Sequence, residues 1–252
     1  MLIKSTSKNK KVPYHKKVIN NIKKHIADID PEFLNFNWII SGSFAVNSLY
    51  APSKDCNDID FYFSSQQDYL NFFNYLSNKH PQSFYSTELA DTFTTLNLQL
   101  IKKFFLTPEE LIYTHDFVNV SVAITLEAIY TTKETHYAWY NEQLDLRNFQ
   151  IPKDSPSTSY EQVLVLNLLL NRTHKYMERY DFRLSSSYKK FLYSQKNFLQ
   201  SINRSQFATE TPLVLNYYGT PVDHSEQIAS AISSINVLLK TDHFNSWEIS
   251  II

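Results

Sequence analysis

Glycine is almost absent from this chain, and its scarcity limits the sites that the chain can build. The 252 residues include only Gly42 and Gly219, whereas average usage of about 7% would supply roughly 18. Phosphate-binding P-loops, dinucleotide-binding Rossmann turns and kinase glycine loops each need several close glycines, because only glycine lets the backbone approach a phosphate closely. The Gly-x-Ser-x-Gly elbow of hydrolases is excluded in the same way. We therefore expect each glycine to serve a local backbone need, such as a positive φ or close contact with a ligand.

The composition indicates a folded protein that does not cross a membrane. Hydrophobic residues make up 43% of the chain, which is enough apolar surface for one large domain or two modest ones. The longest apolar runs, 163–166 and 168–170, are separated by Asn167 and fall far short of the roughly 20 residues that span a bilayer. The polar, lysine-rich start does not resemble a secretory signal. We expect a cytoplasmic protein with no membrane partner.

Metal sites built on cysteine or paired histidines are not expected. Cys56 is the only cysteine, so it can form neither an internal disulfide nor a cysteine-based zinc site. The eight histidines show no close pairing at ligand spacing. A structural metal is therefore not expected.

Residues 1–27 form a basic segment that contains many lysines but no aspartate or glutamate. Val18, Ile22 and Ile26 recur every fourth residue, which predicts an amphipathic helix over 14–27 with its lysines facing outward. Basic segments of this kind contact nucleic acids such as RNA, and they also occur as solvated helix faces. Both interpretations stay open.

Apolar periodicity predicts a mixed α/β region followed by helices. Strands are expected at 36–40, 58–63, 94–101 and 117–124, and helices at 44–50, 68–76 and 108–113. A linker rich in proline and serine is expected at 151–159. Further helices are expected at 160–180, 186–202 and 225–239. We therefore predict an N-terminal domain over residues 1–150 and a mostly α-helical C-terminal domain over residues 151–252.

Asp58 and Asp60 are the clearest candidates for chemistry. Residues i and i+2 of a strand face the same side, so the two carboxylates would lie side by side while Ile59 faces the core. Such a pair suits Mg²⁺, which takes one or two protein carboxylates and completes its shell with water and substrate phosphates. A second cation nearby would stabilise the attacking and leaving oxygens of a phosphoryl displacement. Acidic pairs at strand starts also occur as ordinary turn and solvent residues.

A candidate anion site precedes this pair. The expected strand ends at Gly42 and Ser43, and a helix follows, so backbone N–H groups, the positive helix end and a hydroxyl would converge there. A tight turn at Gly42 and an N-cap at Ser43 would explain the same residues. The candidate phosphate site at Gly42 and Ser43 lies close in the chain to the candidate metal site at Asp58 and Asp60. The two together make a stronger case for a catalytic site than either alone.

The order of these motifs resembles the DNA polymerase β-like nucleotidyltransferase superfamily, in which an apolar strand, Gly-Ser, a helix and Asp-x-Asp follow one another. The matching residues are Ile39-Ile40-Ser41-Gly42-Ser43 and Asp58-Ile59-Asp60-Phe61. Residues 98–101, 108–117 and 172–176 are similar, more loosely, to uncharacterised nucleotidyltransferase-like proteins of phages and large viruses. The resemblance implies an α+β fold, with a nucleotidyltransferase-like mixed β-sheet domain, flanking helices and a mostly α-helical C-terminal domain.

The resemblance also implies an enzyme that moves a nucleoside monophosphate from an NTP, such as ATP, to a hydroxyl and releases pyrophosphate. Asp58 and Asp60 would hold Mg²⁺ or Mn²⁺, and Gly42 and Ser43 would contact the triphosphate. The acceptor stays open between an RNA, such as a tRNA end met by the basic N-terminal segment, a protein and a small molecule. A phage-encoded member would act in the host cytoplasm.

The superfamily usually adds a third carboxylate from a neighbouring strand, and here the sequence departs from the pattern. The expected strand 94–101 offers Asn97 and Gln99, whose amides neither carry charge nor accept a proton. Asp116 is the best substitute as a catalytic group and metal ligand, with Asp91 behind it, although Asp116 also suits a turn cap. Without an acid there, the alternative is a catalytically degenerate fold that binds a nucleotide, RNA or a partner protein.

A basic stripe is expected on the helix 160–180. Arg172, Lys175 and Arg179 fall at i, i+3 and i+7 on one face, beside Tyr176. In this superfamily a helical C-terminal region often closes over the cleft, which implies that the stripe grips phosphates and that Tyr176 stacks on a base. Basic residues in a last helical turn also interact favourably with the helix dipole.

Overall fold

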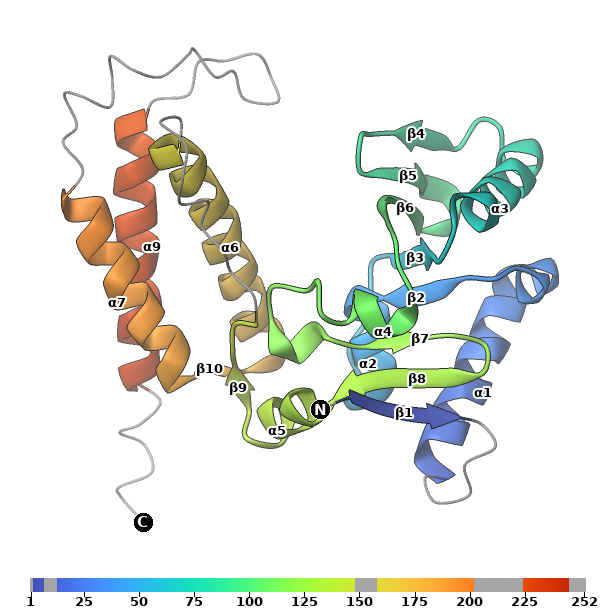
Figure 1. The fold of residues 1–252 in the computed structure, drawn as a ribbon, viewed down its shortest axis with the longest axis horizontal. Helices are drawn as coiled ribbons and strands as arrows, with labels where there is room; N and C mark the ends of the chain where they lie inside the picture. Colours follow the sequence, from blue (N-terminus) through green and yellow to red (C-terminus); the bar gives the residue numbers. More distant parts are fainter. Residues whose placement is uncertain (1, 7–12, 148–157, 202–223, 245–252) are drawn as a thin grey trace. The chain divides into compact units, whose positions relative to one another are not determined.

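The computed structural model describes residues 2–6, 13–147, 158–201 and 224–244. The chain divides into two compact units, Met1–Asn141 and Glu142–Ile252. The first is built on a large sheet and the second is mostly helical (Figure 1), so the predicted α+β fold class is confirmed. The predicted boundary between residues 150 and 151 lies outside the described residues, as does most of the predicted linker.

One mixed sheet of eight strands forms the first unit, in the order β1-β8-β7-β2-β3-β6-β5-β4. The strands are β1 Leu2–Thr6, β2 Ile39–Ser41, β3 Ile59–Phe63, β4 Phe84–Ser86, β5 Ala90–Phe93, β6 Leu98–Phe105, β7 Ala123–Ile124 and β8 Ala128–Thr132. Neighbouring strands are antiparallel, except that β3 and β6 run parallel. A parallel pair needs a crossover connection, and helix α3 (Gln66–Lys79) with the β4–β5 hairpin supplies it.

The two faces of this sheet have different cores. On one face, the rings of Phe33, Phe61 and Phe72 contact one another between the 3₁₀ turn η1 (Pro31–Asn35), β3 and α3. On the other face, Ile39 and Leu111 belong to a buried cluster that helix α4 (Pro108–Leu111) helps to cover. Alternation along the strands therefore sends neighbouring side chains into different cores.

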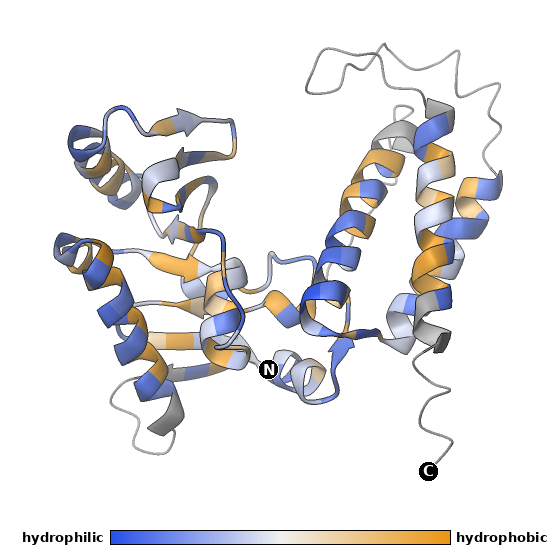
Figure 2. Cartoon of the chain, turned by 180° about the vertical axis from the view of Figure 1, so that it is seen from behind, coloured by the Kyte–Doolittle hydropathy of each residue, from blue (hydrophilic) through white to orange (hydrophobic). Residues whose placement is uncertain are grey.

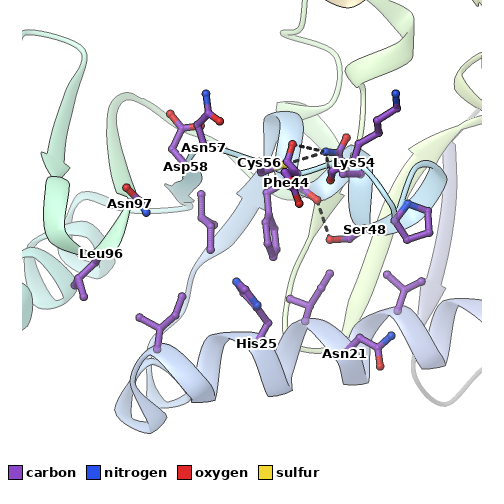
Figure 3. Close-up of a pocket in the computed structure, with 17 residues that line it drawn as sticks. Asn21, His25, Phe44, Ser48, Lys54, Cys56, Asn57, Asp58, Leu96 and Asn97 are labelled. Carbon is purple, nitrogen blue, oxygen red and sulfur yellow. Dashed lines mark hydrogen bonds between the residues drawn. The ribbon is translucent and has the colours of Figure 1, made fainter. Parts of the chain in front are cut away.

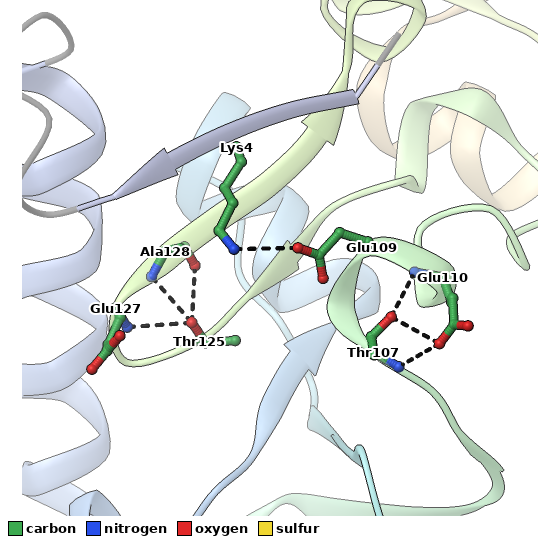
Figure 4. A network of polar contacts seen from close by, with 7 residues as sticks. All are labelled: Lys4, Thr107, Glu109, Glu110, Thr125, Glu127 and Ala128. Atoms are coloured by element: carbon green, nitrogen blue, oxygen red, sulfur yellow. Dashed lines mark hydrogen bonds and ion pairs between the residues drawn. The ribbon is translucent and has the colours of Figure 1, made fainter.

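Polar contacts fix the position of α4. Thr107 and Glu110 form a capping box at its start, which satisfies backbone N–H groups that have no partner within the helix. Lys4 Nζ of β1 lies 3.3 Å from Glu109 Oε1, so the edge strand is joined to the same helix (Figure 4).

The predicted helices of the first unit are confirmed. They correspond to α1 (Pro13–Ile29), α2 (Gly42–Tyr50), α3 and α4. In α1, the residues Val18, Ile22 and Ile26 are all buried, as the four-residue spacing predicted. The lysines Lys16, Lys17 and Lys24 are exposed.

The strand predicted at 117–124 is mostly wrong. Only its end forms β7, whereas Val118–Val120 adopts a 3₁₀ turn, η3. Side chains of helix α5 (Lys133–Tyr140) bind carbonyls of this turn: Thr135 Oγ1 donates to Val118 O at 3.0 Å and Trp139 Nε1 to Asn119 O at 2.9 Å. Backbone acceptors that a strand would have paired are thus satisfied by side chains from a later segment.

The second unit contains the three predicted helices. They are α6 (Thr158–Tyr180), α7 (Ser186–Ser201) and α9 (His224–Phe244), with β9 (Gln143–Leu144) and β10 (Arg183–Leu184) paired in parallel. Apolar and polar residues alternate along these helices (Figure 2), and Leu170 of α6 and Ile235 of α9 are fully buried. None of the helices in the described part of the chain could serve as a membrane span.

Candidate active site

Asp58 immediately precedes β3 and Asp60 is the second residue of this strand, where it lies beside Gly42, the first residue of α2. Ile59 and Phe61 are buried, whereas the two aspartates are half-buried. The alternation of the strand therefore places both carboxylates on the side opposite Phe61 and the core that Phe61 forms with Phe33 and Phe72. In the sheet, Asp60 lies opposite Ser41 of β2 and Gln99 of β6.

Gly42 provides the turn from β2 into α2, and it does so beside Asp60. Its φ is +75°, a conformation that side chains rarely tolerate. A Cβ placed on Gly42 would lie 2.5 Å from Asp60 Oδ2, so the Asp60 carboxylate would have to shift to admit any other residue. The prediction that Gly42 serves a local backbone need is confirmed by its positive φ.

Ser41, rather than Ser43, stands at the N-cap position of α2. Its side chain does not cap the helix: Ser41 Oγ donates to Val122 O at 2.7 Å and lies 2.8 Å from His115 Nε2. Because the single hydroxyl proton goes to Val122, we assign the proton of the second contact to His115 Nε2. Ser43 is half-buried in the first turn of α2.

Gln99 occupies the position on β6 where the superfamily pattern calls for an acid. Its Nε2 donates to Asp58 Oδ2 at 2.7 Å. Asp116 follows α4, next to His115, and is half-buried. Across the part of the chain that the structure describes, no three histidine, cysteine, aspartate or glutamate side chains are grouped so that they could hold a metal. The structure therefore does not bring Asp116 together with Asp58 and Asp60 in one ligand group.

Asp91, the second acid considered for that position, serves the core of the β5–β6 region. It is buried, lies 3.0 Å from Lys102 Nζ and accepts a hydrogen bond from Tyr69. Burial alone would raise the pKa of Asp91, but hydrogen bonds from Ser86, Tyr69 and Lys102 outweigh it and lower the pKa. These contacts account for Asp91 without a role in chemistry.

A cavity of about 590 Å³ adjoins Asp58 (Figure 3). It is bounded by α1, α2, the loop between α2 and β3, and Asn97. Asn47 shapes one wall, because its Nδ2 donates to Lys54 O at 2.9 Å and to Asp55 O at 3.3 Å and lies 3.0 Å from Cys56 Sγ. The sequence prediction missed both the cavity and Asn47. The available signal was the asparagine within the mostly apolar segment 44–49.

The basic stripe of α6 lies in the second unit. Arg172 and Lys175 are exposed. Tyr176 is only 7% exposed, and its ring stacks on that of Tyr180 with 6.2 Å between centroids. In this structure the ring of Tyr176 is packed inside the unit rather than presented to a base.

The mixed sheet, the glycine turn and the aspartate pair define a nucleotidyltransferase-type fold, and known structures with this fold are similar to the chain. The Thermotoga maritima CCA-adding enzyme complexed with tRNA matches at 13% identity and a TM-score of 0.54, covering 96% of this chain and 55% of that one. A CCA-adding enzyme with CTP matches at 15% identity and a TM-score of 0.52, covering 96% and 54%. A tRNA-processing enzyme in an apo form matches at 18% identity and a TM-score of 0.51, covering 87% and 57%. The chain thus spans about half the length of these structures.

The family is identified separately. The model of the Gabija anti-defense 2 family protein (Gad2) matches residues 9–141, more than half of the chain. The chain therefore belongs to the Gabija anti-defense 2 family. No curated protein matches it.

Proposed function

We propose that the chain is a metal-dependent nucleotidyltransferase, which moves a nucleoside monophosphate from an NTP to a hydroxyl group and releases pyrophosphate. The observation that carries this proposal is the contact between Asp60 and Gly42. It puts a metal-binding side chain directly beside the start of a helix, where backbone N–H groups favour phosphate. Metal and triphosphate would therefore meet at one point.

The donor set fits Mg²⁺ or Mn²⁺. Asp58 and Asp60 supply hard carboxylate oxygens, and both are partly exposed, so water and phosphate oxygens can complete the coordination. Ions held there would neutralise charge on the attacking and leaving oxygens. Gln99 donates to one oxygen of Asp58 and thereby fixes the orientation of that carboxylate.

The first turn of α2 would bind the triphosphate. The first N–H groups of a helix have no partner within it, and here they belong to residues that follow Ser41. The Ser43 hydroxyl adds a further donor. Ser41 holds the preceding strand end through Val122 and His115, so the turn is in place before the substrate arrives.

For the acceptor we propose an RNA, with a protein or small-molecule hydroxyl as the other open classes. The similar structures support RNA, because they include a CCA-adding enzyme complexed with tRNA, alongside CCA-adding enzymes bound to CTP and to ATP. Exposed lysines of α1 give the chain a basic surface for a nucleic acid. The chain belongs to an anti-defence family, and we therefore propose that the transfer opposes the Gabija defence in the host cytoplasm.

A second candidate function is a nucleotidyltransferase fold that binds a nucleotide, RNA or a partner protein without turnover. Gln99 favours this alternative, because an amide stands where the superfamily pattern has its third acid. Among the described residues, Asp116, the proposed third catalytic group and ligand, forms no three-residue ligand group with the pair.

Incubation with each α-³²P-labelled NTP, Mg²⁺ or Mn²⁺, and either tRNA or cell lysate tests the proposal. We expect label on the acceptor, and a loss of at least about 100-fold in the Asp58→Asn and Asp60→Asn variants. Asp28→Asn, an exposed acid on α1, is the matched control and should keep full transfer. Absence of label together with metal-dependent NTP binding would instead support the second candidate.

A further inference from the structure

We propose that the cavity beside Asp58 binds a nucleoside, with the base against His25 and Phe44. The nucleoside belongs either to a free nucleotide or to the terminal nucleotide of an RNA acceptor. The inference rests on the proposed function for the nature of the ligand, and on the lining of the cavity for its position.

The size and place of the cavity suit such a ligand. Its volume of about 590 Å³ lies within the range of roughly 300–1,000 Å³ typical of small-molecule sites. Its wall includes Asp58, one of the two proposed metal ligands. Asp58 therefore connects the cavity to the proposed metal site, because it lines the first and belongs to the second.

Two aromatic rings offer a surface for the base. His25 of α1 and Phe44 in the first turn of α2 lie with their ring centroids 5.2 Å apart and their planes at 36°. Both side chains project into the space between the two helices (Figure 3). Because every base has a flat π face, rings in this position bind bases with little dependence on sequence.

Polar and apolar residues share the lining of the cavity, so a base and the polar edge of a nucleoside could both find partners there. Asn57 and Asn97 are among the lining residues, and an asparagine amide can both donate to and accept from a base edge or a ribose hydroxyl. The Asn97 carbonyl accepts from Ile59 N at 2.9 Å, which holds this residue against β3. Lys54 at the wall supplies a positive charge for a phosphate.

Cys56 allows occupancy of the cavity to be measured without turnover. It lines the cavity and is the only cysteine of the chain, so alkylation by N-ethylmaleimide, followed by intact mass, reports on this position alone. The reaction is run in EDTA with AMP, GMP, CMP or UMP, or with a short RNA that ends in a 3′-hydroxyl. At a ligand concentration of about four times Kd, we expect alkylation to slow about fivefold.

Variants separate the stacking surface from the proposed catalytic pair. In His25→Ala, the ligand concentration needed for protection should rise about tenfold, whereas His80→Ala, outside the cavity, should leave it unchanged. Asp60→Asn removes a proposed metal ligand that does not line the cavity, so it should abolish transfer and keep protection. In the unmodified chain, transfer without any protection of Cys56 would overturn this inference alone. Protection of Cys56 without any transfer would overturn the proposed function alone.

The two ligand sources give different results. Protection by mononucleotides assigns the cavity to the free nucleotide, and protection by the RNA alone assigns it to the acceptor end. The inference is overturned if neither slows alkylation, or if His25→Ala is protected as well as the unmodified chain.

Discussion

The carboxylate of Asp60 fills the space that a side chain at Gly42 would need, since a Cβ there would lie 2.5 Å from Asp60 Oδ2. Gly42→Ala should therefore destabilise the protein by about 2 kcal/mol or more, through strain at positive φ and through this contact. Transfer should fall with it, because the carboxylate must move. Chemical unfolding and the labelling assay measure the two effects.

A double variant separates the two causes. Asp60→Ala removes the oxygen that the new methyl group meets but leaves φ unchanged, so Gly42→Ala should cost less stability in that background. Equal costs in both backgrounds would mean that backbone strain alone explains the glycine.

Gln99→Glu should make stability depend on Mg²⁺. The substitution would set a second carboxylate against Asp58 Oδ2, where the amide now donates at 2.7 Å. Repulsion should lower stability in EDTA by about 2 kcal/mol, and Mg²⁺ should restore it. Thermal unfolding with and without Mg²⁺ measures the difference. Gln99→Met removes the donor without adding charge, and it should show no such gain from the metal.

Ser41→Ala should lower stability, whereas Ser43→Ala should weaken binding of the NTP. The Ser41 hydroxyl is buried and joins Val122 to His115, so its loss should lower stability by about 2 kcal/mol. Ser43 is only half-buried, and its proposed contact is with the triphosphate. Ser43→Ala should thus raise KM for the NTP while the unfolding midpoint stays the same. A stable Ser41→Ala variant would remove the anchoring role assigned to this hydroxyl.

Asp30 should stabilise the folded protein at neutral pH and lose this contribution in acid. Burial would raise the pKa of Asp30, but hydrogen bonds from Lys79, Tyr75 and the backbone N–H of Glu32 outweigh it and hold the pKa below its ordinary value of 3.8. The stabilisation is therefore complete above about pH 4 and is lost as the pH falls through the lowered pKa. Asp30→Asn should cost about 2 kcal/mol at pH 7 and much less at pH 2. Urea unfolding across this range tests the difference.

Local patterns in the sequence predicted the centre of the first unit, because the strand, turn and helix around Gly42 are specified by neighbouring residues. Edge elements were missed. All three residues of β4 are exposed, so no alternation marks it, and β1 pairs with β8, which lies far along the chain. The cavity was missed for the same reason: its walls come from segments that meet only in the folded chain.

The candidate site was predicted in part. The placement of Asp58 and Asp60 on the same side of the chain was predicted from the two-residue period of a strand. The need for glycine at position 42 was predicted from the scarcity of glycine in the chain. The hydrogen bond between Gln99 and Asp58 could not be predicted, because it depends on the register of two strands. The contact of His115 with Ser41 depends in turn on where α4 packs.

The parallel pairing of β3 with β6 also determines when the site can form. Asp58 and Gln99 are 41 residues apart in the chain, and they meet only after α3 and the β4–β5 hairpin have closed the crossover. Contacts of such long range form slowly during folding, after local helices. During refolding from denaturant, nucleotide binding should therefore recover in the last kinetic phase, when the helical signal is already complete.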